Sequence, residues 1–290
     1  MSVGFKSLFL LVCCLVLNTS YGYEQIRHNK ISSAKEDYQF KMLKLALSYS
    51  DKQFTFQEQA QYLNQTKLLK ELESGRIDVA WVGTSVDYEE SCLPVRIPLF
   101  KGLLGHRIFL IKKGNQAKFD NIDNLAALSK LRAGQVTSWT DARILKKAGL
   151  NLVSTNKYNN LFHMLDGERF DYFPRSLYSP WSEMLNYPEL DLEVEKSLMI
   201  VYPLPAYIFV NKENKALHQL ILSGFMKAIE DGQFDKQFYN HPLIKEGLAK
   251  SQIDKRIILK VSNQEISPLT PLDDDRLWFD IEKFKQQNAM

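Results

Sequence analysis

Two segments of the chain repeat the same order of apolar and polar positions. Residues 68–81 and residues 161–174 each start with an apolar stripe at helical spacing, continue through Gly75 or Gly167, and end in an apolar run, without a gap between the two copies. Each copy therefore predicts an amphipathic helix, a helix stop and a strand. The stripe consists of Leu68, Leu69 and Leu72 in the first copy and of Leu161, Phe162 and Leu165 in the second.

The strand of the first copy, residues 77–82, is apolar at nearly every position, which is typical of a strand covered on both faces. Helix followed by strand, repeated along a chain, favours α/β lobes with mostly parallel sheets. The same patterns predict further elements, and we expect the segment after residue 258 to pack as a tail over the surface of one lobe. The predicted helices cover 36–49, 140–148 and 217–230, and the predicted strands cover 54–57, 107–112, 135–137 and 207–210.

The first 22 residues have the pattern of a secretory signal peptide. Lys6 precedes an apolar run over residues 8–17, and Ser20-Tyr21-Gly22 offers small residues for cleavage after Gly22. The run is too short to span a bilayer comfortably, so we expect a periplasmic protein without a membrane anchor. Removal of this segment leaves Cys92 as the last of 3 cysteines, which excludes an internal disulfide.

Composition narrows the class of protein further. The chain has 290 residues, of which 45% are hydrophobic and 24% charged, enough apolar material for one large or two modest domains. The net charge of +3 falls by one when Lys6 is removed, and no basic stripe is present. Nucleic-acid binding is therefore not expected. The 5 histidines are scattered without a metal-binding spacing, so we expect no metal and no cofactor.

An ordered series of segments resembles the extracellular solute-binding proteins of family 3, the amino-acid-binding type. The resemblance covers nearly the whole mature chain and is carried by residues 72–79, 98–100, 105–112, 169–171 and 228–232. It implies the type II periplasmic-binding-protein fold, with two α/β lobes and a two-strand hinge. The implied first lobe is discontinuous, residues 23–111 plus 208–290, and residues 112–207 form the second. The hinge strands would cross near 110–112 and 206–208.

Ligands of open α/β sheets bind outside the carboxyl ends of the strands, so we sought candidates there. In the first lobe the duplicated strand ends at Trp81, Gly83, Thr84 and Ser85, where hydroxyls and backbone amides are offered to a ligand. The resemblance implies an arginine shortly afterwards, for the carboxylate of an amino acid. Glu90 stands at about that place instead, and Arg96 is the alternative.

In the second lobe, Ser138, Trp139 and Thr140 stand at a predicted helix start, where free amides and the helix dipole attract anions. Arg175 ends the second duplicated strand, and its guanidinium can hold a carboxylate with two parallel hydrogen bonds. The resemblance implies an acidic residue near Arg175 or Ser176, and none is found at either position.

These residues predict a periplasmic solute-binding protein that closes two lobes on an amino-acid-like or small carboxylate ligand. The expected partners are that ligand and an ABC permease or a membrane sensor, and we expect a monomer. Two alternatives remain open: a dehydratase-like periplasmic enzyme on the same fold, or a sensor module that acts through a separate membrane receptor. Glu89 and Glu90 are the acids available for catalysis, and no nucleophile motif is present, so we expect no enzyme.

Overall fold

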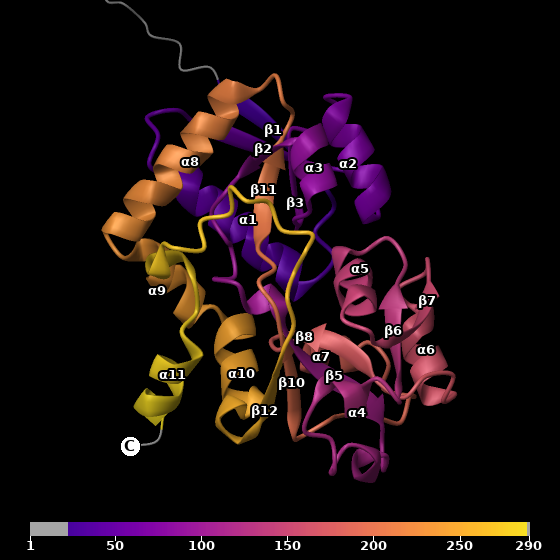
Figure 1. Cartoon of the computed structure of the whole chain (residues 1–290). Helices are drawn as coiled ribbons and strands as arrows, with labels where there is room; N and C mark the ends of the chain where they lie inside the picture. Colours follow the sequence, from indigo (N-terminus) through magenta and orange to yellow (C-terminus); the bar gives the residue numbers. More distant parts are fainter. Residues whose placement is uncertain (1–22, 289–290) are drawn as a thin grey trace, which may run out of the picture.

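The computed structural model describes residues 23–288, so the predicted signal peptide, residues 1–22, lies outside the described part. Four groups of paired strands, two in each lobe, form two lobes with their own helices, which we call the first and the second lobe (Figure 1). Every helix in the described part is too short or too polar to cross a lipid bilayer.

The first lobe is built on a sheet in which β1 and β2 are parallel and β11 is antiparallel to β3 and β4. The N–H of Asp78 donates to the carbonyl of Arg27 at 2.9 Å and joins the two parts of this sheet. Its elements are β1 (Glu24–His28), α1 (Ala34–Leu47), β2 (Phe54–Glu58), α2 (Gln65–Glu73), β3 (Val79–Gly83), α3 (Val86–Ser91), β4 (Leu93–Val95), β11 (Ala206–Val210), α8 (Lys215–Glu230), α9 (Gln233–Asn240), α10 (Pro242–Ser251) and α11 (Ile281–Asn288).

The second lobe contains the strand order β12-β10-β5-β8, with β9 also paired to β5, and the parallel pair β6-β7. A bridge between Ala133 and Tyr172 joins the pair to the rest. Its elements are β5 (His106–Lys112), α4 (Leu125–Leu128), β6 (Arg132–Val136), α5 (Thr140–Lys147), β7 (Asn151–Thr155), α6 (Asn160–Asp166), β8 (Phe173–Ser176), α7 (Pro180–Met184), β9 (Leu192–Val194), β10 (Leu198–Val201) and β12 (Ile257–Lys260).

The duplicated unit is present as α2 with β3 and as α6 with β8. Side chains alternate between the two faces of a strand, and those of β3 are buried on both faces, as its apolar sequence predicts. Val79 and Trp81 join the main core, whereas Ala80 and Val82 join a cluster beneath α2.

Three expectations differ from the structure. The sheets are mixed rather than mostly parallel, because β11 and β8 return antiparallel to their neighbours. Gly75 adopts the left-handed conformation at φ 70°, but in the second copy Glu168, at φ 53°, takes that role instead of Gly167. The third concerns the lobe boundaries.

The strand pairing places both boundaries between the lobes at other residues than the expected ones. All of β5 pairs within the second sheet, so the chain leaves the first lobe earlier than residue 111, over residues 96–105, the first crossover. It returns over residues 202–205, the second crossover, to β11. The two crossovers touch, since the N–H of Tyr202 donates to the carbonyl of Gly105 at 3.1 Å. A Cβ on Gly105 would lie 1.9 Å from the carbonyl oxygen of Tyr202, so only glycine fits there.

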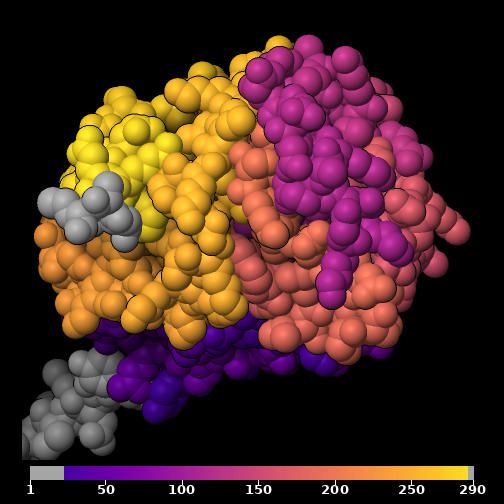
Figure 2. Space-filling model, turned by 90° about the horizontal axis from the view of Figure 1, so that it is seen from below, coloured from indigo at the N-terminus to yellow at the C-terminus, as the bar shows by residue number. Residues whose placement is uncertain are grey.

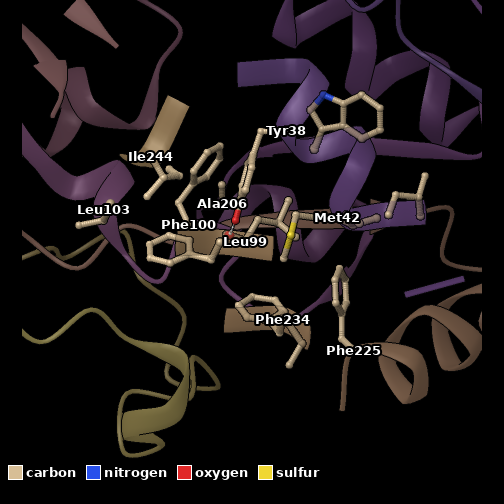
Figure 3. Packing of buried hydrophobic residues seen from close by; sticks show 14 of the residues in the cluster. Tyr38, Met42, Leu99, Phe100, Leu103, Ala206, Phe225, Phe234 and Ile244 are labelled. Atoms are coloured by element: carbon tan, nitrogen blue, oxygen red, sulfur yellow. Dashed lines mark hydrogen bonds between the residues drawn. The ribbon is translucent and has the colours of Figure 1, made fainter. Parts of the chain in front are cut away.

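The main apolar core fills the first lobe and continues past the crossovers (Figure 3). Tyr38 on α1 donates its hydroxyl to the carbonyl of Leu99 at 2.6 Å. Phe100 stacks on Tyr178, which follows β8 of the second lobe, with ring centroids 4.7 Å apart. Ile108 on β5 belongs to the same core. The two lobes therefore share apolar packing beside the crossovers.

Candidate functional site

The ends of β3 and β6 bring the two lobes into direct contact. Each strand is followed at once by a helix, α3 in the first lobe and α5 in the second. The hydroxyl of Tyr88 on α3 donates to the carbonyl of Ser138 at 3.2 Å, and Arg143 on α5 lies 3.4 Å from the carboxylate of Asp87. α3 and the start of α5 thus meet at one junction between the lobes.

The first-lobe candidates are buried at the start of α3. The backbone N–H of Thr84 donates to Pro205 of the second crossover at 3.0 Å, and its hydroxyl donates to Glu89 at 2.8 Å. Ser85 is the N-cap of α3, yet its buried Oγ has no hydrogen-bond partner among the described residues. Gly83 ends β3 with its Cα beside Leu104 of the first crossover. Buried polar atoms normally have partners, so the unpaired Oγ of Ser85 is unusual.

The predicted acid of the first lobe is replaced by its neighbour. Glu90 is exposed, whereas the side chain of Glu89 is 5% exposed and forms an ion pair with Arg96 at 2.6 Å. One helical position separates the two glutamates, so sequence spacing alone did not distinguish the inward one. Arg96, the alternative arginine, lies beside this segment and is paired with Glu89.

Trp81 lies away from the junction. Its ring centroid is 5.9 Å from that of His28 and 6.4 Å from that of Phe40, inside the core of the first lobe. Alternation along β3 explains this position, because residue 81 shares its face with Val79.

The second-lobe helix α5 begins at the junction. Trp139 is its N-cap residue, and Thr140 follows with a buried Oγ that has no hydrogen-bond partner in the described part of the chain. Asp141, one position later, is held by the buried guanidinium of Arg107 and by the hydroxyl of Tyr202. Ser176, at the end of β8, accepts a hydrogen bond from Arg107 at 2.9 Å. This network fixes the first turn of α5 against β5 and β10.

Arg175 is buried and already holds a carboxylate from its own lobe. Its Nε and Nη2 donate to Glu183 on α7 at 2.7 and 2.5 Å, a geometry that matches the fork of a guanidinium. Burial opposes the charged form of both groups, but the charge of each partner outweighs it, so the pKa of Arg175 is raised and that of Glu183 is lowered. The remaining nitrogen, Nη1, is buried without a partner among the described residues.

Three aromatic rings surround this guanidinium. The Cζ of Arg175 lies 4.5 Å from the centroid of Phe173, 5.1 Å from that of Trp139 and 5.2 Å from that of Tyr158. Cations are attracted to the faces of such rings, so the rings hold the side chain in place. Trp139 thus connects Arg175 to the start of α5.

Lys35 faces the same charges from the first lobe, in the first turn of α1. Its side chain is exposed and makes no ion pair within 4.0 Å in the described residues. The charges of Glu36 beside it and of Arg175, Glu183 and Arg107 of the second lobe act on its ammonium group. No sequence pattern marks Lys35 or Glu183, since each is an ordinary helix position.

The junction brings together hydrogen-bond donors rather than metal-ligating side chains. No three His, Cys, Asp or Glu side chains within residues 23–288 are placed to hold a metal ion. The prominent surface hollows lie elsewhere on the first lobe, one of about 560 Å³ between α1 and the α9–α10 region, lined by Lys41, Lys44, Leu45, Gln237, Asn240, His241 and Pro242.

Comparison with known proteins bears on the fold. No protein-family model and no curated protein matches the sequence. Among solved structures, an ancestral arginine-binding protein bound to arginine aligns over 75% of this chain and 98% of its own, with a TM-score of 0.56 and 18% identity. The chain has the two-lobe periplasmic-binding-protein fold.

Two further periplasmic-binding-protein structures agree. A periplasmic binding protein of Salmonella typhimurium, described for its high arginine specificity, aligns over 73% of this chain and 96% of its own, with a TM-score of 0.54 and 16% identity. An amino acid ABC transporter substrate-binding protein of Streptococcus pneumoniae, bound to L-arginine, aligns over 77% and 95%, with a TM-score of 0.54 and 15% identity. These neighbours are almost fully covered, whereas about a quarter of this chain lies outside the shared region.

Proposed function

We propose that this chain is an exported solute-binding protein that captures a small anionic solute, amino-acid-like or a small carboxylate, between its two lobes. The bound form would be presented to a membrane permease or a membrane sensor. The fold supports the binding role, because solved proteins of this architecture bind amino acids and serve ABC importers. Of the two acids considered for catalysis, Glu89 is engaged by Arg96 and Glu90 is exposed.

One observation supports an anionic ligand. Ser85 Oγ in the first lobe and Thr140 Oγ1 and Arg175 Nη1 in the second are buried polar atoms without partners among the described residues. A guanidinium nitrogen can only donate, and hydroxyls can donate or accept. A carboxylate is a group that each of these atoms can donate to, and the start of α5 offers the positive end of a helix dipole.

The charge of the ligand is inferred from the ion pairs around the junction. Arg175 is paired with Glu183, Arg107 with Asp141, and Arg96 with Glu89. Lys35, by contrast, is exposed, and the charges of Arg175 and Glu183 act on it. A monoanionic group that reaches Lys35 and Arg175 therefore adds a missing charge partner, and a strongly acidic ligand is disfavoured by Glu183.

The test is a thermal-shift screen of the mature chain, residues 23–290, against amino acids, small carboxylates and short peptides. A ligand that binds the folded form alone raises the melting temperature, by about 2.7 kcal/mol of added stability at a hundred times its Kd. Calorimetry on each hit then gives the affinity. If only cationic compounds without a carboxylate raise the melting temperature, the anionic ligand is refuted.

A further inference from the structure

The C-terminal strap, which we define as residues 256–279, starts in the second lobe and ends in the first. In Figure 1 it rises from β12, passes along the junction of the lobes and continues toward α11. The segment after residue 258, which was expected to pack as a tail on one lobe, therefore connects the two lobes. Viewed from below, the gold atoms around α10 and β12 lie directly against the second lobe (Figure 2).

The strap is fixed to the second lobe at its beginning. β12 pairs in parallel with β10, and the N–H of Val261 donates to Val201 at 2.9 Å. Leu259 and Val261 are buried in the core of the second lobe. Arg256, also buried, donates to the carbonyl of Leu198 at 2.8 Å. Residues 256–261 therefore move with the second lobe.

The end of the strap is fixed to the first crossover and the first lobe. The N–H of Phe279 donates to the carbonyl of Lys101 at 2.8 Å, and Leu277 and Phe279 are buried in the main core. Trp278 covers Gly102, whose added Cβ would lie 2.5 Å from the indole ring. Both ends are thus anchored, and they are anchored in different lobes.

Between its anchors the strap touches the second crossover and both helices of the junction. The side-chain amide of Asn263 donates to the carbonyl of Pro203 at 2.7 Å. Glu265 accepts hydrogen bonds on its carboxylate from Arg143 and Lys147 of α5, each at 2.6 Å. Its backbone carbonyl accepts from the N–H of Val86 on α3 at 3.2 Å. One residue therefore binds α5 of the second lobe and α3 of the first.

We propose that the strap is a third connection between the lobes and that Glu265 holds them closed without a ligand. Separation of α3 from α5 breaks either the hydrogen bond to Val86 or the two ion pairs of Glu265. The side chain of Glu265 is 12% exposed, and its partners Arg143 and Lys147 are 37% and 48% exposed, so two charge-assisted bonds converge on one largely buried carboxylate at the edge of the junction. Ligand exchange then depends on the release of Glu265, a control that simple two-crossover hinges lack.

The test measures the ligand-free protein, so its outcome does not depend on the proposed function. Spin labels at Lys70→Cys and Lys157→Cys, both exposed, place one probe in each lobe, while the native Cys92 is buried. Pulsed electron resonance reports the distance between the labels. Mass spectrometry of the denatured sample verifies that no solute copurified.

Wild-type protein should give one narrow distance that fits the present structure. Glu265→Ala should add a longer, broader population and should raise the exchange rate of the Val86 amide about tenfold. Lys147→Ala, which removes one of the two ion pairs from the other side, should give a smaller change in the same direction. Far-ultraviolet circular dichroism confirms that each variant is folded.

Glu246→Ala is the matched control, because Glu246 pairs with Lys250 inside α10 and connects no lobes. It should leave the distance and the exchange rate unchanged. The proposal is overturned if Glu265→Ala matches wild type, if Glu246→Ala produces the same opening, or if the wild-type protein is already open.

Discussion

The buried pair of Arg175 and Glu183 permits a quantitative prediction about stability. Their side chains are 7% and 15% exposed, and two hydrogen bonds join them. Removal of one partner leaves the other charge buried without compensation, which costs about 3–5 kcal/mol. In a chain of this size that corresponds to a fall in melting temperature of roughly 10 °C. We therefore expect Glu183→Leu and Arg175→Met each to destabilise the protein strongly.

The double variant separates this charge effect from loss of packing. With both charges gone, no unpaired ion remains, and apolar replacements of similar size are often neutral. Arg175→Met/Glu183→Leu should therefore lose less than about 2 kcal/mol, which makes the coupling energy of the pair about 3 kcal/mol or more. Urea titrations followed by tryptophan fluorescence give the four stabilities, and Trp139 lies beside the guanidinium as a local probe.

An additive result would refute this reasoning. If the double variant loses the sum of the two single losses, the pair does not interact energetically, and its geometry carries no weight for the site. The exposed pair of Glu246 and Lys250 serves as the reference, with an expected coupling of at most about 1 kcal/mol.

Three further predictions follow from single positions. Burial lowers the pKa of His106 to about 4, so the folded state binds a proton at this imidazole less readily than the unfolded state does. The free energy of unfolding therefore falls as the pH drops from 6.5 toward 4, by about 3 kcal/mol at pH 4. His106→Gln should remove that part of the acid sensitivity in urea titrations at pH 7 and pH 4. Gly224→Ala should destabilise by about 1–3 kcal/mol in the same titrations, because the added Cβ would lie 1.9 Å from the carbonyl oxygen of Ala46 where α8 crosses α1. Lys35→Gln should weaken a carboxylate ligand by about 1–3 kcal/mol in calorimetry.

Each of these three predictions would be contradicted by one result. An equal acid response of wild type and His106→Gln would show that His106 titrates normally in the folded protein. A Gly224→Ala variant as stable as Gly167→Ala, whose Cβ meets its nearest atom at 3.2 Å, would show that α1 and α8 separate easily. An unchanged affinity for Lys35→Gln would place Lys35 outside the binding site.

Local patterns predicted the elements well because they depend on neighbours in the sequence. The duplicated helix and strand, the helix α8 and the buried strand β11 all appear within a few residues of their predicted bounds. The two-lobe architecture followed from the order of these elements together with the resemblance. Boundaries between lobes were less predictable, since β5 is apolar throughout and sequence alone does not show which sheet it joins.

Sequence reasoning could mark candidate residues only near the ends of predicted strands. Ser85, Thr140 and Arg175 were chosen on that ground, and each has a buried polar atom without a hydrogen-bond partner in the described structure, as several other residues such as Gln135 and Tyr178 also do. Glu183, Lys35 and Glu265 were missed because their importance comes from partners distant in sequence. Glu265 lies 122 residues from Arg143, and no local period relates two such positions.

The parallel pairing of β12 with β10 also has a consequence for how the protein reaches its native state. Residues 198–201 emerge from the ribosome long before residues 257–260, so the sheet of the second lobe lacks its edge strand until almost the whole chain has been synthesised. Contacts of such long sequence separation form slowly, because a large loop must close first. Late completion of this edge would keep the chain loosely folded for longer, which is the state that the proposed export through a secretion channel requires.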